Sequence, residues 1–198
     1  MPTVPRSIHQ IWLQGDALPE PLAGYVAHVI EVCKAGGWTH TLWTAKDLSA
    51  LTKVSQAAFG TLAPKCCHLS QQSNVLRYLI LQDLGGLYLD TDVDLRVLPD
   101  ELMGAWIPAT RTLLRVGSFA LACSAQDPWA KRIVALCAQA NLGISGSAGS
   151  KLVAASRAPD VNVWPRGTWE DWNGHLAKLG IHHWLGHQMG HFVKKATP

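Results

Sequence analysis

A helix that leads into a short hydrophobic strand ending in two acidic residues constrains this chain most. Residues 70–84 carry apolar side chains at helical spacing, and Gly85-Gly86 ends that pattern. The apolar run Leu87-Tyr88-Leu89 is typical of a buried parallel strand, and Asp90 and Asp92 follow it. Side chains two residues apart in an extended backbone point the same way, so both carboxylates can converge on one cation.

The two carboxylates predict a metal site in combination with the helix before them. On its own, an Asp-x-Asp sequence at a strand end often only begins a turn. Here Asn74 and Arg77 lie one helical turn apart on the preceding helix and can together grip an anionic group. Carboxylate oxygens suit Mg²⁺ or Mn²⁺, which bind through one or two carboxylates and the oxygens of a substrate phosphate. The pattern therefore predicts a metal–diphosphate site, with a nucleotide sugar as its first candidate ligand.

The same residues resemble a known family. Glycosyltransferases of the family 32 type carry Ser-(Asp or Asn)-x-x-Arg-Tyr and then Gly-Gly-x-Tyr-x-Asp-x-Asp in their sugar-binding region, matched here by residues 73–78 and 85–92. Residues 4–12 and 41–43 are similar to the family's opening Ile-Pro-Lys-x-Ile-His-Gln-Ile-Trp and to its later Leu-Trp. The family includes yeast outer-chain mannosyltransferases, bacterial capsule and O-antigen enzymes and, more distantly, clostridial glucosylating toxins. The resemblance covers residues 4–98 and implies the GT-A fold.

Strand and helix patterns alternate along the chain and predict an α/β fold with a mainly parallel sheet covered on both faces. Strands are expected at 8–13, 39–43, 86–90, 105–109 and 118–124, helices at 21–34, 47–58, 70–84 and 128–140, and a loop at 143–150. With 198 residues, 48% of them hydrophobic, the chain can bury one good core. We therefore expect a single Rossmann-like GT-A domain. Residues 1–98 would bind the nucleotide sugar, and residues 99–198 would form the acceptor side and a C-terminal metal–diphosphate segment.

Composition says more about the cellular compartment of the protein than about the reaction it catalyses. No apolar run reaches the roughly 18 residues that suggest a membrane-spanning helix, and residues 1–6 lack the apolar core of a signal peptide. The five cysteines are an odd number, and Cys66 and Cys67 are adjacent, which favours reduced thiols in the cytoplasm. The net charge of +3 is too small to indicate nucleic-acid binding. P-loop, dinucleotide-binding and Ser-His-Asp patterns are not recognisable.

The family resemblance implies roles for the matched residues. Asp92, with Asp90 directly or through water, would hold Mn²⁺ or Mg²⁺ on the diphosphate, and Arg77 and Asn74 would orient the donor sugar. Asn74 stands where the family usually has Asp, which leaves the sugar preference open. On a generic helix, Arg77 would more often form an ion pair within the protein.

Two aromatic residues complete the predicted nucleotide-sugar pocket. Trp12 lies near the end of the first strand, where the resemblance implies stacking on the nucleotide base, although an indole there can equally fill the core. Tyr88, between the glycines and the carboxylates, would shape the pocket.

The C-terminal segment offers further metal ligands. Residues 181–188 are similar to the family's closing His-His-Trp-x-Gly-Ser-Trp, which supplies metal and diphosphate contacts. His183 is the favoured additional ligand and His187 the second candidate, since imidazole is a competent ligand. Alternation along a strand places His183 on the opposite face from His182. Surface histidines beside a basic tail are the alternative interpretation.

These observations predict a metal-dependent glycosyltransferase that uses a UDP- or GDP-sugar. The resemblance implies retention of anomeric configuration. The expected acceptor is a glycan or a lipid-linked sugar, and a protein or a hydroxylated base in DNA would also fit.

Two alternative functions come from other classes of protein. In a phosphatase of the haloacid-dehalogenase type, Asp90 would attack phosphate, but such enzymes carry this strand near the chain start and need a later acidic pair. A non-catalytic nucleotide-sugar-binding module would bind the donor without turnover.

Overall fold

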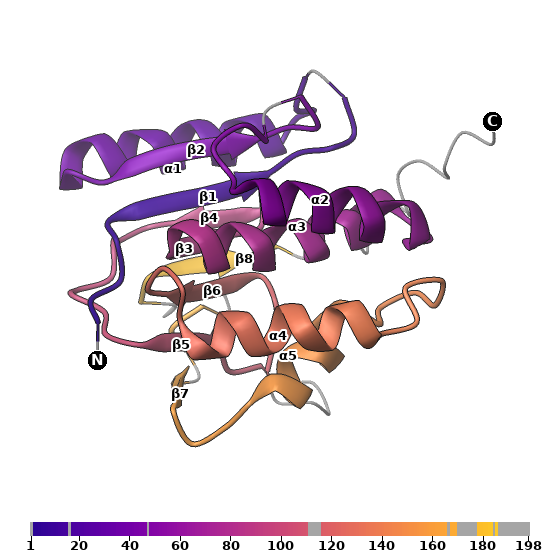
Figure 1. Ribbon diagram of the computed structural model, residues 1–198. Helices are drawn as coiled ribbons and strands as arrows, with labels where there is room; N and C mark the ends of the chain where they lie inside the picture. Colours follow the sequence, from indigo (N-terminus) through magenta and orange to yellow (C-terminus); the bar gives the residue numbers. More distant parts are fainter. Residues whose placement is uncertain are drawn as a thin grey trace.

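The computed structural model describes residues 2–15, 17–46, 48–110, 116–165, 167–169, 178–183 and 185. The strands are β1 (Ser7–Ile11), β2 (Thr39–Trp43), β3 (Gly86–Leu89), β4 (Val93–Leu95), β5 (Ala105–Pro108), β6 (Ala120–Cys123), β7 (Val161–Trp164) and β8 (Gly180–His182). The helices are α1 (Leu22–Gly36), α2 (Lys53–Leu62), α3 (Leu69–Leu84), α4 (Pro128–Gln139) and α5 (Ser150–Ser156), with a short 3-10 helix, η1 (Ala63–Lys65). Figure 1 shows their arrangement.

A six-stranded sheet in the order β2-β1-β3-β6-β5-β7 forms the centre of the molecule. Strand β1 is parallel to β2 and β3, and β5 is parallel to β7, whereas β6 runs antiparallel to both of its neighbours. The predicted α/β fold with a mainly parallel sheet is confirmed. Because β1 and β3 are parallel, the residues that follow both strands emerge at the same edge of the sheet, where open α/β folds bind ligands.

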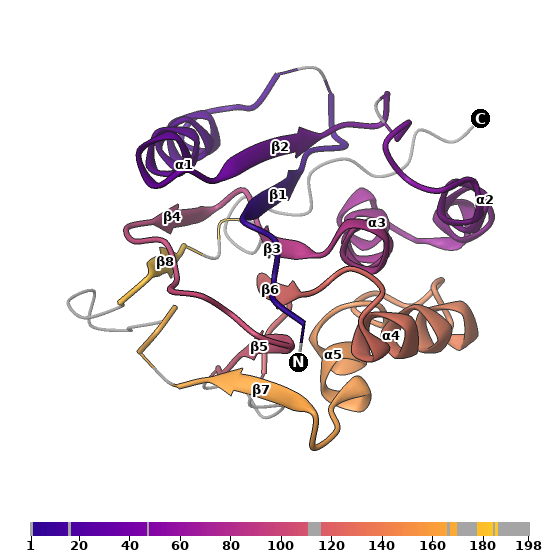
Figure 2. The ribbon, with the colours of Figure 1, turned by 60° about the vertical axis from the view of Figure 1, so that its left-hand side comes forward.

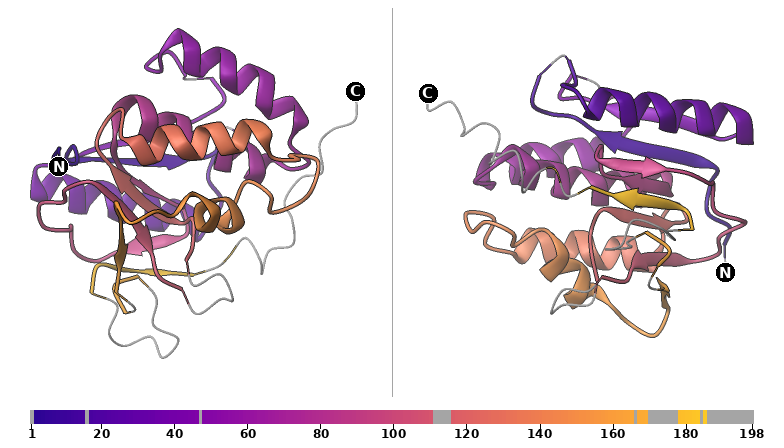
Figure 3. Two further views of the ribbon diagram at one scale, coloured as in Figure 1. Left: turned by 60° about the horizontal axis from the view of Figure 1, so that its bottom comes forward. Right: turned by 180° about the vertical axis from the view of Figure 1, so that it is seen from behind.

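Helices and a small ribbon cover the two faces of the sheet. Helices α2 to α5 lie on one face, and α1 lies on the other together with the antiparallel pair β4–β8 (Figure 2). Seen from behind, the yellow strand β8 lies alongside the pink strand β4 (Figure 3). No helix in the described part of the chain is both long and apolar enough to cross a bilayer.

Strand β3 lies in the middle of the core and sends side chains to both faces. Leu87 and Leu89 pack into the cluster beneath α1, and Tyr88 packs into the cluster beneath α3, which includes Leu76 and Ile80. All of these side chains are almost completely buried. The alternation of the strand therefore turns Tyr88 toward α3, the helix that carries Asn74 and Arg77.

Gly85 and Gly86 allow α3 to turn directly into β3. Both have positive φ angles, +68° and +95°, a conformation that L side chains rarely adopt. A Cβ atom on Gly85 would collide with the backbone around Ser124, and one on Gly86 would collide with Ser7 of β1. The two glycines thus provide both the backbone angles and the space for the helix–strand junction.

Most predicted elements have their expected positions, and the exceptions are short or displaced. The five predicted strands and three of the four predicted helices agree with the structure to within about two residues at each end. The helix expected at 47–58 begins only at Lys53, because the Thr52 side chain caps it by accepting a hydrogen bond from the amide of Ser55. Elements β4, α5, β7 and β8, of three to seven residues each, were not predicted.

Candidate active site

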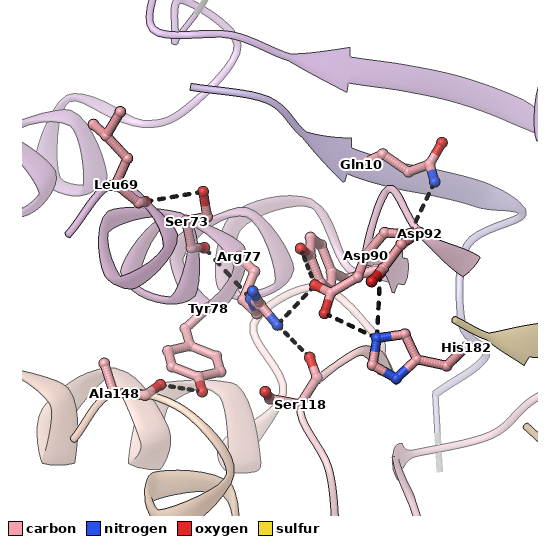
Figure 4. Close-up of polar contacts among 11 residues, drawn as sticks. Gln10, Leu69, Ser73, Arg77, Tyr78, Asp90, Asp92, Ser118, Ala148 and His182 are labelled. Atoms are coloured by element: carbon pink, nitrogen blue, oxygen red, sulfur yellow. Dashed lines mark hydrogen bonds and ion pairs between the residues drawn. The ribbon is translucent and has the colours of Figure 1, made fainter. Parts of the chain in front are cut away.

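Two carboxylates and one imidazole meet just beyond the end of β3. Asp90 follows β3, Asp92 precedes β4, and the pairing of β4 with β8 brings His182 beside them. The Nε2 atom of His182 lies 3.2 Å from Oδ1 of Asp92 and 3.9 Å from Oδ2 of Asp90 (Figure 4). Each of the three residues offers one ligand atom, and these atoms all lie within 4.8 Å of one another. The predicted convergence of the two carboxylates is therefore present, with an imidazole added.

The histidine beside the carboxylates is His182, not the favoured His183. His182 is buried, and its ring stacks on Phe119 with centroids 4.2 Å apart. The His183 ring stacks instead on Tyr25 of α1, at 4.5 Å. Alternation correctly separated the two rings, but it could not tell which face of the strand meets the carboxylates, because that depends on the unpredicted pairing with β4. The second candidate, His187, lies outside the described residues.

Asp92 is held as a carboxylate by the C-terminal part of the chain. Its Oδ1 atom contacts His182, and its Oδ2 atom accepts a hydrogen bond from the amide of Leu185 at 2.9 Å. Burial on its own would raise the pKa of Asp92. The hydrogen bond and charge of His182, together with the Leu185 amide, outweigh that effect and lower the pKa below its ordinary value. The ionised form, which can ligate a cation, is thereby favoured.

Asp90 is held by residues of α3 and β3. Its Oδ1 atom accepts a hydrogen bond from the Tyr88 hydroxyl at 2.6 Å and lies 3.2 Å from Nη1 of Arg77. The guanidinium group of Arg77 also lies over the Tyr88 ring, 4.3 Å from its centroid. Arg77 is almost completely buried and donates further hydrogen bonds to the carbonyls of Ser73 and Ser118. Arg77 therefore forms an ion pair within the protein, as an arginine on a helix commonly does, and its partner Asp90 belongs to the candidate site.

The segment His9-Gln10 connects the first strand to both ends of β3, a role that the sequence analysis missed. The Gln10 side chain donates to the backbone carbonyl of Asp90 at 3.1 Å. His9 contacts the carbonyl of Gly85 through Nε2 at 3.0 Å and accepts from the indole of Trp43 through Nδ1 at 3.2 Å. Two polar residues enclosed between Ile8 and Ile11 were the available signal, because buried polar groups need partners.

The remaining predicted site residues lie nearby with separate contacts. Trp12 follows β1 and is partly exposed, and its indole N–H donates to the carbonyl of Ala17 at 3.1 Å. Trp12 is therefore not a fully buried core residue, and its stacking on a base stays a prediction. Asn74 is half-buried on α3, and a Cβ atom placed on Gly149 would lie 3.6 Å from its Nδ2 atom. Its contact with a donor sugar also stays a prediction.

Comparison with known families places this site in context. Residues 21–105 match the family model described as "Glycosyltransferase sugar-binding region containing DXD motif". The matched segment contains α1, α3 and β3, and therefore Arg77, Asp90 and Asp92, but it ends before His182.

Two curated relatives come from Schizosaccharomyces pombe. The chain is 26% identical over 108 residues to inositol phosphoceramide mannosyltransferase 1. The aligned segment covers 52% of this chain and 32% of that protein. It is 28% identical over 109 residues to inositol phosphoceramide mannosyltransferase 3, with coverages of 54% and 30%. The match thus spans about a third of the length of these relatives.

Solved structures share the fold at low sequence identity. The PaToxG glycosyltransferase superposes with a TM-score of 0.59 at 15% identity, covering 78% of this chain and 69% of that one. A glycosyltransferase involved in glycosylation of the major capsid of PBCV-1 superposes with a TM-score of 0.52 at 14% identity, covering 89% and 91%. Together with the family match, these likenesses show a GT-A-like fold in which residues 21–105 match the DXD-containing sugar-binding region of glycosyltransferases. The family resemblance seen in the sequence is confirmed.

Proposed function

We propose that this chain transfers a sugar from a GDP- or UDP-linked donor to an acceptor hydroxyl in a reaction that depends on a divalent cation. The observation that carries the proposal is the convergence of Asp90, Asp92 and His182 at the end of β3, within the DXD-containing region. Such a site at the edge of an α/β sheet lies where this kind of fold binds nucleotides.

The donor set fits Mn²⁺ or Mg²⁺. Two carboxylates are typical of either ion, and the added imidazole favours Mn²⁺, because nitrogen ligands suit transition metals better than Mg²⁺. Asp92 and His182 would hold the ion, with Asp90 contributing directly or through water. When bound, the cation neutralises charge on the departing diphosphate as a Lewis acid.

The protein's own residues would fix the donor around this centre. Arg77 and Tyr88 hold Asp90 in place through its Oδ1 atom. Asn74 can both donate and accept hydrogen bonds to sugar hydroxyls. Trp12, at the end of β1, would stack on the nucleotide base. Family resemblance supports retention of anomeric configuration by front-face attack, with the leaving phosphate helping to take the acceptor proton.

The acceptor is proposed from the relatives and from the chain's setting. The names of the two curated relatives support a mannose donor and a lipid-linked acceptor, and a glycan fits the family equally. A protein or a hydroxylated DNA base would be less usual acceptors. We place the reaction in the cytoplasm, because none of the five cysteines, all of which the structure describes, forms a disulfide. Residues 1–98 would bind the donor and residues 99–198 would complete the site within a single domain.

The two alternatives differ in what they require. A phosphatase of the haloacid-dehalogenase type needs a nucleophilic aspartate, whereas Oδ1 of Asp90 is already bound by Arg77 and Tyr88, and the fold is GT-A. A non-catalytic binding module would bind the same donor without consuming it.

Turnover of nucleotide sugars tests the proposal. The purified chain is incubated with UDP- and GDP-hexoses and Mn²⁺, and release of nucleoside diphosphate is measured with and without chelator. We expect metal-dependent release from at least one donor. Donor binding without release would favour the non-catalytic module, and full activity in chelator would exclude the metal mechanism.

A further inference from the structure

A loop rich in glycine and serine is fastened to the helix that carries Asn74 and Arg77. We call residues 144–149, which form the later part of the connection between α4 and α5, the glycine-serine loop. The Gln71 side chain donates to the carbonyl of Ile144 at 3.0 Å and to the hydroxyl of Ser147 at 2.7 Å. The Tyr78 hydroxyl donates to the carbonyl of Ala148 at 2.7 Å (Figure 4). Helix α3 therefore holds the loop at both of its ends.

The two side chains that fasten the loop are themselves buried and have their polar groups occupied. Gln71 is 2% exposed, and its remaining oxygen accepts from the thiol of Cys67 at 2.8 Å. Tyr78 is completely buried. Neither side chain is available to contact a ligand, so their contribution is to the position of the loop.

Asn74 lies between this fastening and the carboxylates. Successive residues of an α-helix are rotated by about 100°, so Asn74 lies on the helix surface between Arg77 on one side and Gln71 and Tyr78 on the other. Arg77 reaches Asp90, whereas Gln71 and Tyr78 reach the loop. The half-buried amide of Asn74 is consequently bordered by the carboxylate site and by the glycine-serine loop.

Gly149 keeps the loop open next to that amide. A Cβ atom placed on Gly149 would lie 3.6 Å from Nδ2 of Asn74. A larger residue would occupy space immediately beside the Asn74 amide.

We propose that the glycine-serine loop forms a wall of the donor-sugar pocket, with Gln71 and Tyr78 as positioning residues and Gly149 as a determinant of which sugars fit. This inference rests on the proposed function, in which Asn74 binds the donor sugar. It adds that the loop, although distant in sequence from the DXD region, decides how the sugar portion is bound and leaves the nucleoside diphosphate portion to the rest of the site.

Paired binding measurements separate the sugar from the diphosphate. Dissociation constants are determined by calorimetry with Mn²⁺ for GDP, GDP-mannose, UDP and UDP-glucose, using wild-type protein and the variants Gln71→Leu and Tyr78→Phe. We expect the affinity for the free diphosphate to change less than about twofold, and that for its nucleotide sugar to fall about fivefold or more, because Tyr78→Phe removes one buried hydrogen bond to the loop and Gln71→Leu removes two. Gln72→Leu is the matched control: Gln72 also bonds a backbone carbonyl, that of Ala63, and should leave both affinities unchanged.

A second variant adds bulk and leaves the fastening intact. Gly149→Val should reduce nucleotide-sugar affinity about tenfold, with the diphosphate again unaffected, by the cost of displacing or overpacking neighbours. Gly60→Val in α2 is its control, because a Cβ at Gly60 meets no atom within 4 Å. Melting curves of all variants confirm that each is folded.

The outcomes of these measurements distinguish a failure of the inference from a failure of the proposed function. If the diphosphates bind with metal but the loop variants affect sugar and diphosphate binding alike, or neither, the loop is not a wall of the sugar pocket and the inference is wrong. The inference is also wrong if the loop variants change only the transfer of sugar to an acceptor and leave donor binding unchanged. If neither diphosphate binds in a metal-dependent way, the proposed function itself fails, and the inference fails with it.

Discussion

The two carboxylates of the site are supported in different ways by different parts of the chain. Asp90 is fixed from α3 and β3 by a buried guanidinium group and a tyrosine hydroxyl, both directed at its Oδ1 atom. Asp92 is held by an imidazole and a backbone amide from the C-terminal segment. Arg77 remains charged at any ordinary pH, and its partner Tyr88 packs in the core, so the support of Asp90 is permanent. The support of Asp92 comes from a histidine that can itself become a metal ligand.

This difference suggests a division of labour. Oδ1 of Asp90 is engaged within the protein, and its Oδ2 is directed toward His182 at 3.9 Å. Asp92 and His182 are already in contact and can both turn their ligand atoms to one cation. Asp92 and His182 should therefore dominate metal affinity, and the Asp90 side should mainly determine the geometry of the site.

Removal of Asp92 should have the largest effect. Asp92→Ala should abolish metal-dependent sugar transfer and reduce Mn²⁺ affinity by at least about a hundredfold, since a primary carboxylate ligand is lost. The fold should survive, because the residue lies in the turn between β3 and β4. Manganese titration and a turnover assay measure this. Asp94→Ala, two residues farther along and 30% exposed, is the matched control. Equal loss in both variants would contradict a specific ligand role.

The two adjacent histidines should differ clearly. His182→Ala should weaken Mn²⁺ binding about tenfold to a hundredfold. His183→Ala should leave Mn²⁺ binding unchanged, because its ring stacks on Tyr25 and not on the carboxylates. Isothermal titration of Mn²⁺ into both variants compares them directly. A stronger effect at His183 would show that the carboxylates meet the opposite face of the C-terminal strand.

The two supports also explain what the sequence could and could not predict. Asp90, Asp92 and Arg77 lie on one continuous helix–strand unit, so helical and strand periodicity sufficed to bring them together. His182 reaches the same site only through the three-residue pairing of β8 with β4, about ninety residues away in the chain. Such short strands carry too little periodicity to be recognised, and their register decides which histidine faces the metal.

For the fold, too, features set by residues close in the sequence could be predicted, and features set by distant residues could not. Long elements with strong patterns, such as α3 and α4, were predicted closely. The antiparallel direction of β6 could not be predicted, because it is set by the sheet and not by the strand's own residues. Likewise, the role of His9 depends on Gly85 and Trp43, which only the folded structure brings to it.

His9 offers a test of the β3 side through pH. Its burial, moderated by the Gly85 carbonyl, lowers the pKa of His9 from 6.5 to about 4. A proton on Nδ1 would also displace the hydrogen bond from Trp43. Between pH 6.5 and pH 4, His9 binds a proton in the unfolded chain but not in the folded chain. The free energy of unfolding should therefore fall as the pH drops from 6.5 to 4. The expected loss is about 3 kcal/mol.

Urea unfolding at pH 7.0, 5.5 and 4.5 measures this dependence. His9→Gln should be less stable at pH 7 but should lose less further stability on acidification than the wild type. The same substitution at His28, whose side chain is 48% exposed, is the control for replacing a histidine as such. A pH dependence that is identical in wild type and His9→Gln would show that His9 does not titrate as its burial implies.

The smallest expected effect comes from the hydroxyl that fixes Asp90. Tyr88→Phe keeps the ring beneath Arg77 but removes the 2.6 Å hydrogen bond to Oδ1 of Asp90. Because Arg77 continues to hold the carboxylate, we expect turnover to fall only about threefold to tenfold, in line with the net contribution of one ordinary hydrogen bond. Manganese affinity should change less than twofold, since Asp92 and His182 would remain intact. Kinetics and Mn²⁺ titration on the same preparation separate the two quantities. If Mn²⁺ affinity fell as far as in His182→Ala, Asp90 would be a primary ligand equal to Asp92, and the proposed division between the two carboxylates would be wrong.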